Sequence, residues 1–282
     1  MHAIPGDPFA QENAVPEEVA KALHNYYGLD QSLFLQYIHF LKQLLHFNLG
    51  PSLHFQGHFV HEIISESFPV SFCLGLEAMA FALPIGILLG FFSGLSRYRW
   101  KDRLFTSITA LAISIPGFVL ATLLQYLAFR WDFLPVARWG TFAHSLLPAF
   151  SLAAMPAAFM ARLIRAGVRE VWEQDFILTA KAKGLSLPRI LFRHVLPNAC
   201  IPFLAYLGPL FVAIFTGSFA IEKIFGIPGL GQWFVMSIIN RDYTMILGLA
   251  LFYSALLLCI NFIIDLFYLW IDPRMRRKLP NA

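Results

Sequence analysis

Charged residues are scarce in this chain of 282 residues. They make up 13% of the sequence, whereas hydrophobic residues make up 58%. Soluble domains use about 25% charged residues to cover their surface. The mean hydropathy of +0.63 points the same way. So little charge excludes an ordinary soluble protein and predicts that much of the molecular surface faces lipid.

Cysteines and catalytic signatures are also few. Cys73, Cys200 and Cys259 lie far apart in apolar runs, without a CxxC pair. This pattern is typical of small buried side chains and argues against a disulfide framework or a thiolate zinc site. The sequence contains no GxxxxGK[ST], HExxH or GxSxG motif. We therefore expect no catalytic residue, no nucleotide site and no cofactor bound by this chain.

Long apolar segments dominate the chain after residue 67. Five of them cover approximately 68–94, 104–129, 145–164, 199–221 and 244–271. A helix needs about 20 apolar residues to cross a bilayer, and each segment is of that order. The sequence thus predicts an all-α integral membrane fold, a bundle of five transmembrane helices. Prolines inside these segments are tolerated because neighbouring helices satisfy the freed carbonyls; they are Pro84, Pro116, Pro156 and Pro209.

Positive charge predicts how the helices are oriented. Fifteen of the 21 lysines and arginines lie in 95–103, 162–196 and the last ten residues. These segments alternate with the apolar ones, so all three can be cytoplasmic at once. A net charge of +4 could suit nucleic acid, but charge segregated in this way indicates membrane topology, and no nucleic-acid partner is expected.

Three regions follow from this topology. We assign residues 1–66 to an extracytoplasmic segment, 67–272 to the transmembrane domain and 273–282 to a basic cytoplasmic tail. The first residues, from Met1 to Pro5, have neither a basic n-region nor an apolar h-region. They do not form a signal peptide. We expect an additional upstream helix to carry the external segment across the membrane; the alternative is that the first apolar helix of this chain pulls the segment across.

The cytoplasmic segment 162–196 is more than a polar connector. Good helix formers occupy 170–183, with acids early and lysines late, which suits the helix dipole. Gly184 predicts a helix stop, and Ser186 with Pro188 predicts the start of a second short helix, which Pro197 would end. The small side chains of Ala180 and Ala182 would let a partner approach closely. A connector lying on anionic headgroups is the alternative that this pattern leaves open.

Several motifs together carry a family resemblance. Thr179–Leu185 and Arg193–Ala199 resemble the EAA loop of ATP-binding-cassette (ABC) importer permeases. Further motifs resemble the first ("B") permease of dipeptide, oligopeptide and nickel importers, in the same order along nearly the whole chain; they are Ile4–Pro8, Gly28–Asp30, Asn48–Gly50, Ile115–Phe118, Gln174–Phe176, Pro228–Gly231, Arg241–Tyr243 and Asp272–Arg274. Thr179 and Lys181 stand around Ala180 where the broader motif has Glu-Ala-Ala.

The resemblance implies a permease that forms the path for oligopeptides or dipeptides through the plasma (inner) membrane. Its implied partners are a homologous second permease, two ABC ATPase subunits that use the ATP, and an extracytoplasmic solute-binding protein. The family has a sixth, N-terminal helix, and this sequence begins where that helix should end. The residues implied to dock the ATPase are Asp175, Phe176, Thr179, Ala180, Lys181, Ala182, Lys183, Gly184 and Leu185.

A few polar groups invite further hypotheses. Glu77 and Asp265 lie within apolar segments, and an intramembrane carboxylate is costly enough to face protein or water. For Glu77 an interhelical hydrogen bond competes with a place in the path, and Asp265 is near the cytoplasmic end. His54, His58 and His61 would share a face on a helix and form a weak candidate site for Zn or Ni; a polar outer surface is the alternative.

The segment 225–231 is glycine-rich and external. Pro228, Gly229 and Gly231 belong to a candidate outer gate, for which an ordinary turn is the alternative. Residues 31–47 are expected to form an amphipathic helix on the outer surface. Competing functions remain: a nickel or other small-solute importer, or a secondary transporter driven by an ion gradient. The latter predicts inverted repeats, which the sequence does not show.

Overall fold

The structure is a computed structural model that describes residues 31–271, apart from 56, 97, 216 and 217. Its regular elements in this range are helical, with one isolated β-bridge between Pro51 and Phe59. The long helices are α3 (Val60–Leu95), α4 (Arg99–Ser114), α5 (Gly117–Trp131), α6 (Phe142–Trp172), α10 (Ile201–Phe215) and α13 (Tyr243–Ile271). The shorter ones are α2 (Leu33–Leu45), α7 (Asp175–Ala182), α8 (Leu187–Ile190), the π-helical turn η1 (Leu191–Val195), α9 (Leu196–Ala199), α11 (Phe219–Phe225) and α12 (Leu230–Ile239).

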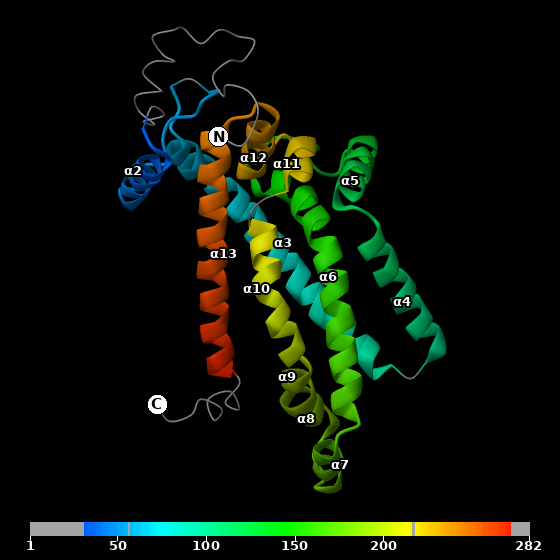
Figure 1. The fold of residues 1–282 in the computed structure, drawn as a ribbon. Helices are drawn as coiled ribbons and strands as arrows, with labels where there is room; N and C mark the ends of the chain where they lie inside the picture. Colours follow the sequence, from blue (N-terminus) through cyan, green and yellow to red (C-terminus); the bar gives the residue numbers. More distant parts are fainter. Residues whose placement is uncertain (1–30, 56, 97, 216–217, 272–282) are drawn as a thin grey trace, which may run out of the picture.

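The long helices form an elongated bundle (Figure 1). In the described residues, α3, α6 and α13 are each long and apolar enough to cross a membrane, and the number of spans rises to five if each of two bent helix pairs is one span. The short helices α11 and α12 lie at one end of the bundle, and α7 lies at the other. This confirms the predicted all-α integral membrane fold. Residues 1–30 and the predicted tail lie outside the described residues.

The second predicted span is not one straight helix. It is broken between α4 and α5, which meet at 99°. Ile115 and Pro116 are both extended, with ψ of 117° and 138°, because proline disfavours the helical conformation of the residue before it. Pro84, Pro156 and Pro209, in contrast, lie inside α3, α6 and α10. The expectation that all four prolines are tolerated within helices is therefore wrong for Pro116.

Two other boundaries differ from the sequence prediction. Helix α6 continues through Trp172, so the first third of the predicted loop 162–196 is helix. In this stretch Ile164 and Val168 lie against Gly90 and Gly94 of α3. Pro197 does not end a helix: α8, η1 and α9 follow one another without a break, so Pro197 lies inside a continuous helical run that contains the π-helical turn η1. The helix containing Phe68 begins at Val60, so the last residues of the predicted external segment 1–66 belong to α3.

Helices α3 and α6 pack unusually closely. Gly86, Gly90 and Gly94 are spaced four residues apart and form one stripe on α3. A Cβ atom on Gly90 would be 2.5 Å from the carbonyl oxygen of Ala161, and one on Gly86 would be 2.8 Å from Cβ of Met160. Small residues allow the two backbones to approach this closely. The van der Waals contacts that result stabilise the helix pair in lipid, where the hydrophobic effect does not drive helices together.

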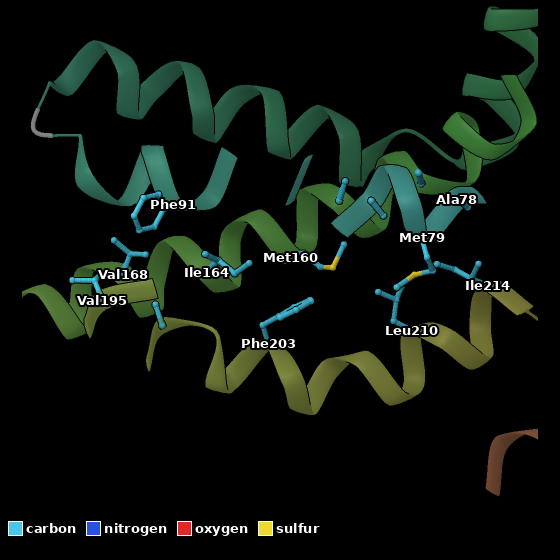
Figure 2. Packing of buried hydrophobic residues seen from close by; sticks show 14 of the residues in the cluster. Ala78, Met79, Phe91, Met160, Ile164, Val168, Val195, Phe203, Leu210 and Ile214 are labelled. Atoms are coloured by element: carbon cyan, nitrogen blue, oxygen red, sulfur yellow. The ribbon is translucent and has the colours of Figure 1, made fainter. Parts of the chain in front are cut away.

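The largest hydrophobic cluster surrounds this contact and extends to α10 (Figure 2). Met160 and Ile164 of α6 are fully buried and lie between the α3 and α10 sides of the cluster. Val195 and Ala199 continue the cluster toward α7. One continuous core therefore joins α3, α6 and α10 to the connection that carries the predicted docking residues.

The beginning of α13 is fixed by a buried aspartate. Asp242 is 0% exposed and its Oδ1 accepts the backbone N–H of Met245 at 3.0 Å, as an N-cap does. Its Oδ2 accepts the hydroxyl of Ser52 and the backbone N–H of His54. Asp242 thereby ties α13 to the turn that precedes α3. Helix α2 forms as predicted, and none of its residues is buried.

Candidate functional site

The segment between α6 and α8 is a short helix held by its own chain. Glu173 and Gln174 turn the chain after α6, and α7 begins at Asp175. Ile177 and Ala180, one turn apart, are 0% and 6% exposed and belong to the main core. Both anchors therefore fix the same side of α7 to the core. Ala180 was predicted to belong to the docking surface; its side chain instead faces the core.

The other side of α7 is free. Phe176, which was predicted to dock a partner, and Leu178, which was not, are 42% and 58% exposed. The other predicted docking residues apart from Ala180 are exposed or half-buried. The ammonium of Lys181 lies 4.1 Å from the ring centroid of Trp172, a cation–π contact that holds α7 against the end of α6. The result is a small surface of apolar and basic side chains at the tip of the bundle.

Helix α7 ends at the glycine that the sequence indicated. Gly184 has φ of +73°, the left-handed conformation that glycine adopts without strain. The backbone N–H of Leu185 donates to the carbonyl of Ala180 at 3.2 Å, and that of Gly184 donates to Lys181 at 2.9 Å. Ser186 then precedes α8 in extended conformation, with Pro188 in its first turn. The predicted stop at Gly184 and the second short helix are confirmed, but the single helix predicted over 170–183 is wrong, because α6 ends at Trp172 and α7 begins at Asp175.

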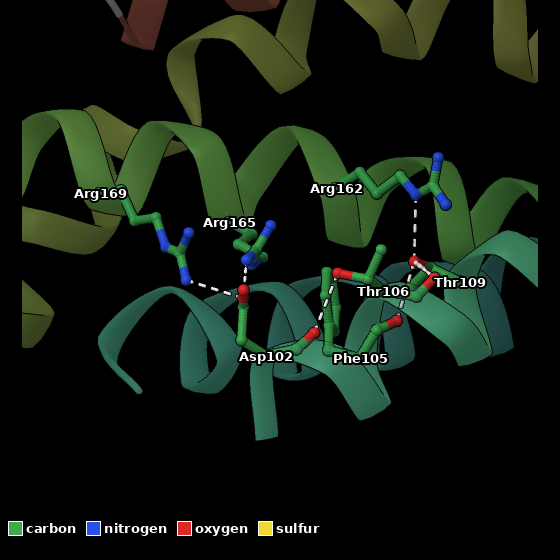
Figure 3. Close-up of polar contacts among 7 residues, drawn as sticks. All are labelled: Asp102, Phe105, Thr106, Thr109, Arg162, Arg165 and Arg169. Carbon is green, nitrogen blue, oxygen red and sulfur yellow. Dashed lines mark hydrogen bonds and ion pairs between the residues drawn. The ribbon is translucent and has the colours of Figure 1, made fainter. Parts of the chain in front are cut away.

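A group of charges near the same end joins α4 to α6 (Figure 3). Asp102 pairs with Arg165 and, at 2.9 Å, with Arg169. One turn further along, Arg162 Nε donates to Thr109 Oγ1 at 3.0 Å. The sequence analysis missed this group, although the spacing of the three arginines along one face of a helix is a signal that could have suggested it.

The predicted outer gate is organised around a buried glutamate that the sequence analysis also missed. Glu222 of α11 is 0% exposed. Ser71 of α3 donates its hydroxyl to Glu222 Oε1 at 2.8 Å and accepts the backbone N–H of Leu230 at 2.7 Å. The Trp233 indole N–H donates to Ser67 at 2.9 Å. These bonds hold the start of α12 and the end of α11 on α3.

The two glycines of this loop are required by close approach. A Cβ atom on Gly229 would be 2.5 Å from Cδ of Glu222, and one on Gly231 would be 3.0 Å from its Oε2. Burial raises the pKa of the Glu222 carboxyl, and the hydrogen bond from Ser71 opposes this more weakly. Pro228 is exposed at the turn. The structure thus brings the predicted loop onto an acidic group with a perturbed pKa.

The remaining predicted residues are scattered. Glu77 is half-buried in α3, and its Oε2 is buried without a hydrogen-bond partner in the described structure; the interhelical bond considered for it is not among the described contacts. Asp265 is exposed on α13. His54 and His58 precede α3 and only His61 belongs to it, so the shared helix face is wrong. Among the described residues there is no group of three His, Cys, Asp or Glu able to hold a metal.

Comparison with known proteins decides the family. Residues 86–277 match the family described as binding-protein-dependent transport system inner membrane component. The chain belongs to this family. It is a multi-pass component of the inner membrane, and this assignment confirms the resemblance found in the sequence.

Individual relatives extend over nearly the whole chain. The dipeptide transport system permease protein DppB of Bacillus subtilis (strain 168) is 45% identical over 98% of this chain and 90% of its own length. The oligopeptide transport system permease proteins OppB of Haemophilus influenzae and Escherichia coli (strain K12) are 39% and 38% identical, each over 98% of this chain and 91% of its own length.

Solved structures support the fold. A chain from the crystal structure of an amino acid ABC transporter with histidines aligns with a TM-score of 0.56 at 19% identity, over 74% of this chain and 94% of that one. An inward-facing structure of the MetNI methionine ABC transporter aligns with a TM-score of 0.58 at 18% identity, over 76% and 96%. At such identities the likeness concerns the fold alone.

Proposed function

We propose that the chain is the permease subunit of an ATP-driven importer and forms the membrane path for oligopeptides or dipeptides. The peptide substrate is supported by the names of the relatives that match over 98% of the chain. The dependence on ATP is supported by the free surface of α7, which projects from the end of the bundle while its other side is anchored in the core. That anchored, exposed helix is the observation that carries the proposal.

Helix α7 is suited to transmit a displacement. Ile177 and Ala180 fix it to the core, Lys181 to the end of α6, and α6 in turn contacts α3 through the glycine stripe. Close-packed helices shift as units because packed cores are not continuously deformable. A partner that moves α7 therefore moves α6 and α3, and with them the outer loop that Ser71 holds on α3.

The partners follow from this role. Two ABC ATPase subunits hydrolyse the ATP, a homologous second permease completes the path, and an extracytoplasmic binding protein delivers the solute. The same proposal includes the domain assignment, with 1–66 external, 67–272 transmembrane and 273–282 cytoplasmic. It also includes the docking residues. Among them we place Phe176 and Leu178 as the apolar contacts, with Lys181, Ala182 and Lys183 beside them. A nickel or other small-solute importer has no comparable support among the named relatives.

The test uses the assembled complex, purified through the ATPase subunits. Phe176→Glu replaces an exposed aromatic side chain of α7 by a charge, and Phe133→Glu does the same in the loop after α5 at the other end of the bundle, where the side chain is 52% exposed. Loss of an aromatic anchor from an interface costs at least about 2 kcal/mol, or roughly 30-fold in affinity. We expect Phe176→Glu to lose the permease from the complex by that order.

The Phe133→Glu control distinguishes a loss of docking from a loss of folding. Phe133→Glu should retain the permease and peptide-stimulated ATP hydrolysis, and both variants should elute as folded chains on size exclusion. Full retention of the Phe176→Glu chain would show that α7 is not the docking helix. Equal loss in both variants would show that the change acts through folding instead of docking.

A further inference from the structure

A hollow of about 800 Å³ opens on the bundle between the end of α3 and the first half of α4. Its apolar wall comes from five side chains that are each 45–63% exposed; they are Leu88, Leu89, Phe92, Leu104 and Ile108. It lies beside the connection 95–103, whose basic residues place it at the cytoplasmic side. A wall of this kind has to be covered by something apolar.

One end of the hollow is polar and cationic. Lys101 is exposed and lines it, with its ammonium 5.1 Å from the ring centroid of Tyr98 and 5.6 Å from that of Trp100. Ser93 and Ser96 line it too, and in the described structure their hydroxyl oxygens are buried without a hydrogen-bond partner. The lining of the hollow thus includes one cation and two hydroxyl groups.

No acidic side chain among the described residues lines the hollow to neutralise Lys101. The nearest carboxylate in the sequence, Asp102, is engaged on the α6 side by Arg165 and Arg169 (Figure 3). The cation therefore has aromatic faces but no anionic partner. A buried hydroxyl without a hydrogen-bond partner is costly, so Ser93 and Ser96 favour an acceptor that arrives from outside the chain.

We propose that this hollow binds one anionic phospholipid of the cytoplasmic leaflet. Its phosphate lies at Lys101, with Ser93 and Ser96 as hydroxyl donors after rotation about χ1, and an acyl chain covers Leu88, Phe92 and Leu104. Basic pockets between helices on the cytoplasmic side bind anionic headgroups, and Trp and Tyr side chains lie at the level of the headgroups.

Charge complementarity distinguishes this occupant from a helix of another protein. An apolar helix would cover the wall but leave the ammonium and both hydroxyls without an acceptor, whereas an anionic lipid satisfies both ends of the hollow. The negative potential of the cytoplasmic leaflet further concentrates the lipid at Lys101. The inference does not depend on which solute is transported.

The experiment places the assembled importer in nanodiscs that contain phosphatidylglycerol with a photoactivatable acyl chain. Labelled peptides are mapped by mass spectrometry, and phosphatidylcholine with the same chain is used in parallel. Lys101→Gln removes the cation that lines the hollow. Arg103→Gln removes an exposed cation from the same helix that does not line it, and therefore serves as the matched control.

We expect labelling by phosphatidylglycerol to concentrate on residues 88–96 and 98–109 and to exceed labelling by phosphatidylcholine. It should fall about fivefold in Lys101→Gln, because one lysine near the surface contributes about that factor, and should be unchanged in Arg103→Gln. Equal labelling by both lipids, or equal loss in both variants, would refute a specific site. Absence of lipid label, with cross-links from position 104 to the second permease, would show that a protein helix covers the hollow.

Discussion

Substitution of Gly90 by alanine tests whether α3 and α6 touch as closely as the structure shows. An added Cβ atom would be 2.5 Å from the carbonyl oxygen of Ala161 and 3.1 Å from its Cα. Contacts below about 3.4 Å are already tight, so the helices would have to separate by about 0.9 Å. A third atom, Cβ of Ile164, would be 2.9 Å away. Two of these atoms belong to the backbone and the Cβ atom is bonded directly to it, so none of them can rotate away.

The sign of the effect distinguishes close from loose packing. Overpacking costs typically about 1–3 kcal/mol, and a backbone obstacle favours the upper part of that range. Alanine in place of glycine inside a helix gains about 1 kcal/mol of intrinsic propensity. The net expectation is therefore a loss of about 2 kcal/mol in the free energy of unfolding. If the helices were not in contact, the same substitution would stabilise the protein.

The assay is a titration of the purified chain from mild detergent into SDS, with helicity followed by circular dichroism. Gly117→Ala is the matched helical control, because a Cβ atom there is no closer than 3.6 Å to any neighbour. Its midpoint should equal or exceed that of the wild type. A Gly90→Ala midpoint at or above the wild-type value would refute the close contact between α3 and α6.

Two further predictions concern charged groups. Burial raises the pKa of Glu222 above its ordinary value of 4.5 in the folded chain, so the folded state binds the proton more tightly than the unfolded state. The free energy of unfolding should therefore fall as pH rises above about 4.5. Glu222→Gln should remove this pH dependence, and a wild-type stability that rises over the same range would contradict the prediction. Asp102→Asn should release α4 from α6 and lower the free energy of unfolding by about 1–3 kcal/mol, because it leaves the half-buried Arg165 without its carboxylate. Asp132→Asn, at the outer end of α5, is the control and should have no effect. Equal effects of the two changes on the SDS midpoint would refute the role of the ion pairs.

Local patterns were sufficient for much of the architecture. The length of each apolar segment determined that the chain spans a membrane, because about 20 residues of helix match the bilayer. The distribution of lysine and arginine predicted the orientation, and the order Gly184, Ser186, Pro188 predicted the end of α7 and the start of α8. Each of these depends only on residues that are neighbours in sequence.

The sequence by itself therefore determined the class of fold, the end of α7 and the family, since hydropathy, charge and helix caps are local properties. Only the tertiary structure decided that Pro116 breaks a span, that Ala180 faces the core, that Gly90 meets α6, and that Glu222 lies buried beside Ser71, 151 residues away in sequence. Those outcomes depend on which helix faces are brought together, and periodicity within one segment carries no information about its neighbour across the bundle.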